Sequence, residues 1–338
     1  MVEKKIVLTG ITTSGTPHLG NLAGAVLPAI KASENKAVSS FLFLADYHSL
    51  IKTLDPSLTH ISSLEIAACW LACGLDPKKV TFYRQSDIPH ILELSWILSC
   101  LTSKGLMNRA HAYKDAVSFN LNSRSEDIDK GITMGLYNYP ILMAADILMF
   151  NADLVPVGSD QKQHLEMTRD IAKRFNHYYG EIFTIPKAQI DNDSGVIPGL
   201  DGRKMSKSYK NVIPVFKNKD ELRKSIMKIK TNSLKPGIPK STDESTIFNI
   251  YKAFSTKVQL DEFSKEFADG ISWSEAKNKL FDLLNEILTP HRTEYERIIN
   301  EKKEIESILN EGAIKALETS SPLLNRVREA VGIRSFNS

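Results

Sequence analysis

Long uncharged apolar runs, a strong net charge and an abundance of cysteine are all missing from this sequence of 338 residues. No apolar stretch of about 18 residues is free of charges, so no membrane span is predicted. Lysine and arginine number 43 against 40 aspartates and glutamates, a net charge of +3. Because so small an excess cannot cover a surface with positive charge, any contact with a nucleic acid must use a local patch. The N-terminus also lacks the apolar core of a signal peptide.

The three cysteines are Cys69, Cys73 and Cys100. Cys69 and Cys73 have the spacing of one helix face and could hold a metal together, but no further Cys or His has a fitting spacing nearby. Core packing is the favoured reading, and no metal site is expected. The reducing cytoplasm is the expected compartment.

Strand patterns alternate with helix patterns in the first part of the chain. Short strands are predicted at 6–10, 41–46, 80–84 and 154–157, and helices at 22–30, 56–73 and 90–101. The apolar run from Phe41 to Leu44 is typical of a parallel strand that is covered on both faces. The alternation predicts an α/β fold with a Rossmann-like, doubly wound parallel sheet.

The composition changes from about Asn218, where Lys, Glu, Ile and Leu recur with helical periodicity. Helices are predicted at 273–288 and 292–309, with a linker at 234–239, and no strand pattern follows up to Arg334. We therefore assign residues 1–215 to the α/β domain and 216–338 to a mostly α-helical domain, although the last helix could pack back on the first. Lysines of this region, such as Lys224 and Lys302, are more typical of a solvated helix face than of an RNA site.

A basic loop, Lys204-Met205-Ser206-Lys207-Ser208, follows a glycine-containing turn. Two lysines in a mobile loop can neutralise the charge that develops on a transferring phosphoryl or nucleotidyl group. A solvated surface loop has the same composition, so this motif alone does not establish a site.

A second glycine-containing turn runs from Thr12 to Asn21, between a predicted strand and a predicted helix. The phosphates of a nucleotide bind at the helix N-terminus in this arrangement. His18 can donate a hydrogen bond there, and Gly20 allows a ribose or a flat ring to approach the backbone. An ordinary surface turn uses the same residue types.

A carboxylate lies in the apolar segment Pro140–Phe150, which predicts a helix with Tyr139, Met143 and Asp146 on one face. A buried, unpaired carboxylate is costly, so Asp146 needs a partner. That partner is either internal, such as Arg109 or a lysine, or a donor on a ligand. His48 follows a predicted strand closely, where open α/β sheets bind ligands, although a plain loop or core histidine remains an alternative.

The segment Leu154–His164 predicts a strand, a glycine turn at Gly158 and a helix that starts near Ser159 or Asp160. Asp160 could serve only as a helix cap, with Gln161 on a polar face. The same strand end could equally hold ribose hydroxyls and an ammonium group.

Taken together, these motifs resemble those of the class I aminoacyl-tRNA synthetases, and more narrowly those of the bacterial tryptophanyl-tRNA synthetases. The motifs that carry the resemblance are Pro17–Asn21, Ala45–His48, Tyr139–Asp146, Val155–His164 and Lys204–Ser208. The resemblance implies that residues 1–215 form a catalytic domain that activates L-tryptophan with ATP and transfers it to tRNA(Trp). It also implies Mg²⁺ bound to the phosphates, an α-helical part that reads the anticodon, and a homodimer.

The resemblance assigns roles to residues that match its motifs. Lys204, Lys207 and His18 would be catalytic. ATP would be bound by Thr12, Ser14, Gly15, His18, Gly20, Asn21, Gly158, Ser159, Asp160, Ile197 and the loop Lys204, Met205, Ser206, Lys207, Ser208. Tryptophan would be bound by Asp146, which would accept its indole N–H, and by Tyr139, Met143, His48, Val155, Val157 and Gln161.

The sequence departs from the pattern of the family in three places. Thr12 and Thr13 stand where glutamine and proline are common, so a side-chain contact of Thr12 with ATP is in doubt. Ser159 replaces the acidic residue often found there, and Tyr209-Lys210-Asn211 follows the lysine loop in place of the common aspartate.

Two rival functions remain open at this stage. One is another enzyme of the superfamily, either a tyrosyl-tRNA synthetase that uses Asp146 for a phenol or an adenylate-forming ligase without tRNA. The other is a non-catalytic paralogue that binds RNA or tryptophan. The long helical region disfavours the ligase, and the presence of His18 and both loop lysines disfavours the paralogue.

Overall fold

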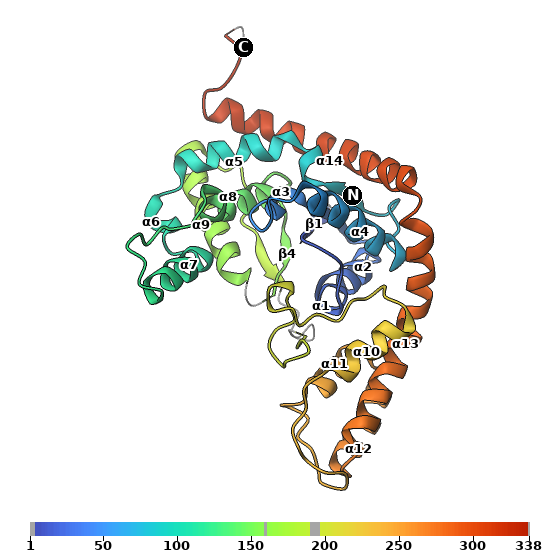
Figure 1. Ribbon diagram of the computed structural model, residues 1–338. Helices are drawn as coiled ribbons and strands as arrows, with labels where there is room; N and C mark the ends of the chain where they lie inside the picture. The colour runs from blue at the N-terminus through green and yellow to red at the C-terminus, as the bar shows by residue number, and fades with distance from the viewer. Residues whose placement is uncertain (1–3, 159–160, 190–196, 337–338) are drawn as a thin grey trace.

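The computed structural model describes residues 4–158, 161–189 and 197–336, and places five parallel strands at the centre of the molecule (Figure 1). The strands are β1 (Lys5–Thr12), β2 (Val38–Ala45), β3 (Thr81–Arg84), β4 (Leu154–Pro156) and β5 (Lys187–Gln189), in the order β3-β2-β1-β4-β5. The strand order reverses beside β1, which is the topology of a doubly wound sheet. The predicted fold class is confirmed.

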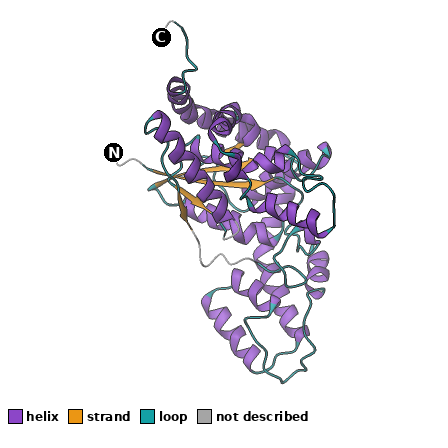
Figure 2. Ribbon diagram, turned by 90° about the vertical axis from the view of Figure 1, so that its left-hand side faces the viewer, coloured by secondary structure: helices purple, strands orange, loops and turns teal. Residues whose placement is uncertain are grey.

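The two faces of the sheet bury alternate side chains of the same strands. In β2, Leu42 and Leu44 join one core with α4 (Pro56–Ala72), while Phe41 and Phe43 join the other with α5 (Pro89–Leu101) and α8 (Met134–Leu148). A strand alternates its side chains between the faces, so a fully apolar run is required where both faces are covered. Figure 2 shows the strands between their helical layers.

The helix that follows β1 is longer and less regular than predicted. It runs through α1 (Leu19–Asn21), a π-helical segment at Leu22–Val26 and α2 (Leu27–Ser33). The predicted helices at 56–73 and 90–101 correspond to α4, which ends before Gly74 at φ +95°, and to α5. Short helices α3 (Asp46–Ser49), α6 (Lys104–Met107) and α7 (His111–Asn122), as well as α9 (Lys162–Tyr179), complete the α/β part.

The rest of the described chain is helical. It comprises α10 (Lys219–Met227), α11 (Thr246–Phe254), α12 (Lys257–Ala268), α13 (Trp273–Ile298) and α14 (Lys302–Ala330). The predicted boundaries of the last two helices were wrong, because α13 continues through Pro290 and the chain breaks at 299–301, inside the segment predicted as one helix. Neither Gly nor Pro marks that break, so it had no local sequence signal.

The last helix returns to the sheet. Figure 1 shows α14 crossing the molecule from α13 to α5, on the far side from the lobe formed by α10–α13. Gly312 of α14 lies so close to β3 that a Cβ atom there would be 1.7 Å from the carbonyl oxygen of Phe82. Arg84, at the end of β3, donates to both carboxylate oxygens of Glu306 at 2.6 and 3.0 Å. These contacts attach α14 to the edge strand.

No helix among the described residues is long and apolar enough to cross a membrane.

Candidate active site

The polar residues that the sequence analysis identified gather at the carboxyl ends of the strands. Thr12 and Ala45 are partners in the register of β1 and β2, so the turn that contains His18 and the turn that contains His48 leave the sheet side by side. Residues after β3 and β4 join the same edge. This edge is where open α/β sheets bind their ligands.

Asp146 of α8 is buried, with 1% of its surface exposed, and its carboxylate has two internal partners. His48 Nε2 lies 2.9 Å from Oδ2, and Gln85 Nε2 donates to Oδ1 and Oδ2 at 2.8 and 3.0 Å. Burial raises the pKa of Asp146, while the bonds from His48 and Gln85 lower it. Arg109, proposed as an internal partner, is not one; it lines a separate depression with Asp170 and Arg174.

A series of contacts between aromatic and amide side chains leads from His48 to Gln161. The rings of His48 and Tyr139 meet edge to face at 6.3 Å between centroids. The Tyr139 hydroxyl lies 2.6 Å from His164 Nε2, and His164 Nδ1 lies 2.8 Å from Gln161 Oε1. The structure thus brings Tyr139, His48 and Gln161 to the same part of the site.

The remaining members of the predicted tryptophan set lie nearby in the fold. Met143 is on α8 one turn before Asp146, and Val155 and Val157 follow the line of β4, with Val155 buried and Val157 half-buried. Gln161 donates its backbone N–H to the carbonyl of Gly158 at 3.0 Å. Ser159 and Asp160, assigned to ATP, lie outside the described residues.

The turn after β1 is held from two sides. The Gly15 N–H donates to Ser62 Oγ of α4 at 2.6 Å, and Gly15 itself has φ +96°, a conformation that favours glycine. The backbone N–H of His18 donates to the Asn21 side chain at 3.1 Å. A Cβ atom on Gly20 would lie 3.0 Å from the His18 ring, so a larger residue there would have to displace this ring. Thr12 and Ser14 are half-buried beside the turn.

The His18 ring is buried, and its Nδ1 has no hydrogen-bond partner among the described residues. Burial, and secondarily the charge of Lys207, lowers the pKa of His18 to about 4. A neutral imidazole therefore faces this part of the site at neutral pH, able to donate from one nitrogen and accept at the other.

The lysine loop lies directly against this turn. His18 and Pro214 form an antiparallel bridge, and Leu19 N–H donates to the Ile213 carbonyl at 3.0 Å. Lys207 Nζ donates to the Gly15 carbonyl at 2.6 Å. Two motifs that are 192 residues apart in the sequence are thus in direct contact.

Burial and, less strongly, the charge of Lys52 lower the pKa of Lys207 to about 8, against the opposing effect of Glu65. Lys52 also experiences the charge of Lys204. The sequence analysis did not identify Lys52, which follows α3 and has no recognisable motif. Three lysines therefore contribute positive charge to this part of the site.

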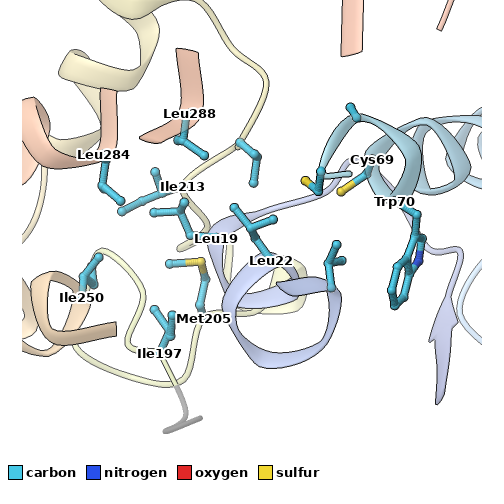
Figure 3. Close-up of a cluster of buried hydrophobic side chains, with 14 of the residues drawn as sticks. Leu19, Leu22, Cys69, Trp70, Ile197, Met205, Ile213, Ile250, Leu284 and Leu288 are labelled. Carbon is cyan, nitrogen blue, oxygen red and sulfur yellow. The ribbon is translucent and has the colours of Figure 1, made fainter. Parts of the chain in front are cut away.

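Met205 and Ile197 anchor the loop in the core. Met205 N–H donates to the Ile197 carbonyl at 2.9 Å, and both side chains are buried. Figure 3 shows them beside Leu19 and Ile213, with Leu284 and Leu288 of α13 close by. The middle of the loop is thus fixed by apolar contacts, while Lys204 is exposed.

Asn211, also missed in the sequence analysis, braces the loop from within. It accepts from Ser206 N–H at 2.8 Å and donates to Asp201 Oδ1 and to the Lys204 carbonyl at 2.7 and 3.1 Å. Tyr209, one of the departures from the family pattern, stacks under the Arg203 guanidinium at 4.4 Å. Among the described residues, no group of three or more His, Cys, Asp or Glu side chains is placed to hold a metal ion.

Comparison with known proteins identifies the class. The family model of the class I tRNA synthetases (W and Y) matches residues 2–289, so the chain belongs to this family. Within it, the chain belongs with the bacterial tryptophan–tRNA ligases. The tryptophan–tRNA ligase of Neisseria meningitidis is 56% identical over 333 residues, covering 98% of this chain and 99% of the relative.

Solved structures agree with this assignment. The tryptophanyl-tRNA synthetase of Campylobacter jejuni, complexed with ADP and tryptophan, has a TM-score of 0.84 and 38% identity, covering 97% of this chain and 99% of its own. The tyrosyl-tRNA synthetase of Aeropyrum pernix, at 18% identity and a TM-score of 0.68, shares only the fold.

Proposed function

We propose that this chain is a tryptophan–tRNA ligase. It activates L-tryptophan with ATP, giving tryptophanyl-adenylate and pyrophosphate, and then transfers tryptophan to the 3′-terminal ribose of tRNA(Trp). The observation that carries the amino-acid specificity is the buried Asp146 carboxylate between His48 and Gln85. A carboxylate has about four acceptor positions, and the described residues supply three donor contacts, so one position can accept the indole N–H.

Asp146, His48, Tyr139 and Met143 form one wall of the proposed tryptophan pocket. Val155 and Val157 contribute from β4, and Gln161, positioned by its contact with His164, would hold the α-amino group. Such a site rejects a ring that lacks the N–H donor, because the buried acceptor would be left short of a partner.

ATP is proposed to bind over the turn after β1. Gly15 and Gly20 allow its phosphates and ribose to approach the backbone, with Ser14, His18 and Asn21 around them. Gly158, Asp160 and the backbone of Ile197 would contact the nucleoside. Lys204, Ser206 and Lys207 would move onto the phosphates, with Lys207 leaving the Gly15 carbonyl for a partner of opposite charge.

In this reaction the protein orients the reactants and stabilises the charge that develops. The tryptophan carboxylate attacks the α-phosphate in line with the departing pyrophosphate, so no proton needs to be removed from the nucleophile. Lys204 and Lys207 stabilise the charge that grows on the leaving group. Mg²⁺ would neutralise phosphate oxygens, and we propose that it is held mainly by ATP.

We further propose that the helical region after residue 215 reads the tRNA anticodon, with α14 structurally part of the catalytic unit, and that the enzyme is a cytoplasmic homodimer. Large apolar side chains stand exposed on α5 and α7, among them Trp96 at 72% and Phe119 at 71% exposed surface. A second copy packed against α5 and α7 would bury them.

The experiment is ATP–pyrophosphate exchange with each of the twenty amino acids, followed by charging of tRNA(Trp). Exchange and charging with tryptophan alone are expected. Exchange with tyrosine would transfer the assignment to the tyrosine enzymes. Folded protein without any exchange would favour a non-catalytic paralogue.

A further inference from the structure

Gln85 is the most completely buried polar contact of Asp146. It is the first residue after β3, in the 3₁₀ turn Gln85–Asp87, and none of its surface is exposed. Its Nε2 spans both carboxylate oxygens of Asp146, at 2.8 and 3.0 Å, across 61 residues of sequence. Its Oε1 is buried and has no hydrogen-bond partner among the described residues.

The orientation of this amide depends on the charge of Asp146. Rotating the amide would place Oε1 against two carboxylate oxygens, which is repulsive while the carboxylate is ionised. The amide N–H groups in turn stabilise the ionised form, because hydrogen bonds to a charged acceptor favour its charged state. Gln85 thus influences both the orientation of the Asp146 carboxylate and its ionisation.

We propose that Gln85 is a specificity-determining positioning residue, which holds Asp146 oriented and ionised so that the pocket offers only an acceptor to the ring of the substrate. This proposal rests on the proposed function. An ionised carboxylate accepts a strong hydrogen bond from an indole N–H, whereas a protonated one has lost part of that capacity and presents an O–H instead. The amide would therefore contribute to discrimination without touching the substrate.

Other charged and titratable groups around Asp146 also influence its ionisation. His48 and Asp46 approach from the α3 turn, and Asp46 is itself bonded by Ser86 N–H at 3.1 Å and by the Ser86 hydroxyl. Tyr83 approaches from β3, and its buried hydroxyl lies within the influence of the Asp146 charge. Burial, and to a smaller extent the charge of Asp46, oppose ionisation of Asp146 and raise its pKa, whereas the hydrogen bonds from His48 and Gln85 favour the ionised form and lower it.

The test compares Gln85→Met, which keeps the length of the side chain and loses the donor, with wild type. The matched control is Gln259→Met on α12, remote from the site. Exchange kinetics are measured from pH 6 to 9 with tryptophan and with 3-(benzothiophen-3-yl)alanine, whose ring has sulfur in place of the indole N–H.

We expect Gln85→Met to lose about tenfold or more of the preference for tryptophan at pH 6 and to regain it toward pH 9, as Asp146 ionises without its amide donor. The KM of Gln85→Met for ATP should equal that of wild type, and Gln259→Met should keep the wild-type preference for tryptophan at every pH. A loss that is equal for both substrates and constant with pH would mean a purely structural role and would overturn the proposal.

Gln85→Glu provides a second route if Gln85→Met fails to fold. Two neighbouring carboxyl groups share a proton at low pH and repel each other when both ionise, so the preference should fall as pH rises, opposite to the trend with methionine. An unchanged preference at every pH would contradict the proposal. Failure of the wild type to use tryptophan would instead refute the proposed function, so the two failures are distinguishable.

Discussion

The two ends of the proposed site differ in how their charged groups are partnered. At the indole end, formed by Asp146, His48 and Gln85, the buried Asp146 carboxylate is contacted by side chains from two other segments, α3 and the turn after β3. At the phosphate end, formed by the His18 turn and the lysine loop, like charges of Lys52, Lys204 and Lys207 accumulate, and one lysine rests on a backbone carbonyl. The first end is built to accept a hydrogen bond from the ring of the substrate, and the second to receive negative charge.

The difference between the two ends follows from the function proposed for each. Selection of one amino acid requires a rigid acceptor whose loss of a partner is costly, which burial provides. Stabilisation of a leaving pyrophosphate requires positive charge that becomes most favourable as negative charge develops. Mutations at the two ends should therefore affect different kinetic constants.

Lys207→Ala should have the largest effect and should act on the rate. Because Lys207 is expected to stabilise the leaving group, its removal should lower kcat for adenylate formation about 100- to 1,000-fold, as loss of a transition-state donor does elsewhere. The KM for tryptophan should change less than about threefold. Single-turnover formation of the adenylate measures the rate, with Lys217→Ala as the exposed control. An unchanged rate would remove the loop from the mechanism.

Asp146→Asn should act at the other end, on tryptophan and not on ATP. Asparagine keeps the shape but turns an amide toward the donors of Gln85 and His48, so about 1.5–3 kcal/mol of interaction is lost, about 10- to 150-fold in kcat/KM for tryptophan. The KM for ATP should be conserved. Normal tryptophan-dependent exchange by the folded variant would refute the role of Asp146.

The pH dependence should belong to the phosphate end. Lys207 has a pKa of about 8 in the free enzyme, so it is cationic below that pH and neutral above it. The value of kcat/KM for ATP should therefore fall about tenfold for each pH unit above 8, since this constant reports ionisations of the free enzyme. Lys207→Arg, which stays charged, should extend the plateau to higher pH. If kcat/KM for ATP fell at the same pH in wild type and in Lys207→Arg, Lys207 would be excluded as the titrating group.

Glu306→Ala should have the smallest effect and should alter neither end. It removes the partly exposed pair between α14 and Arg84, beside Gln85, and should lower the free energy of unfolding by about 0.5–1 kcal/mol. Urea denaturation measures this loss. Tryptophan-dependent exchange should be unchanged, and a lowered kcat would show that α14 influences the site through the end of β3.

Local sequence patterns predicted most of the fold and pointed to several segments that meet at the carboxyl ends of the strands. Apolar periodicity identified the strands β1 to β4 and the helices that cover them, and glycine-containing turns identified His18 and the lysine loop. These features depend on spacing within a segment, which the sequence displays directly.

Contacts between distant segments were not predictable in this way. Gln85 has no local motif, and its role depends on a fold that brings β3 to α8. Asn211 and Lys52 were missed for the same reason, and so was the break between α13 and α14. Burial alone indicated that Asp146 needs a partner. Which residues are its partners could be known only from the arrangement of the strands and helices.

The measurement that tests the central claim most directly is the preference of the wild-type enzyme for tryptophan over 3-(benzothiophen-3-yl)alanine in ATP–pyrophosphate exchange. The two rings have nearly the same size, so the ratio of their kcat/KM values isolates the N–H group read by Asp146. We expect a preference of about 1,000-fold or more, since a buried acceptor left without its donor is strongly disfavoured. Nearly equal values would contradict the account, because the pocket would then select its substrate by shape alone.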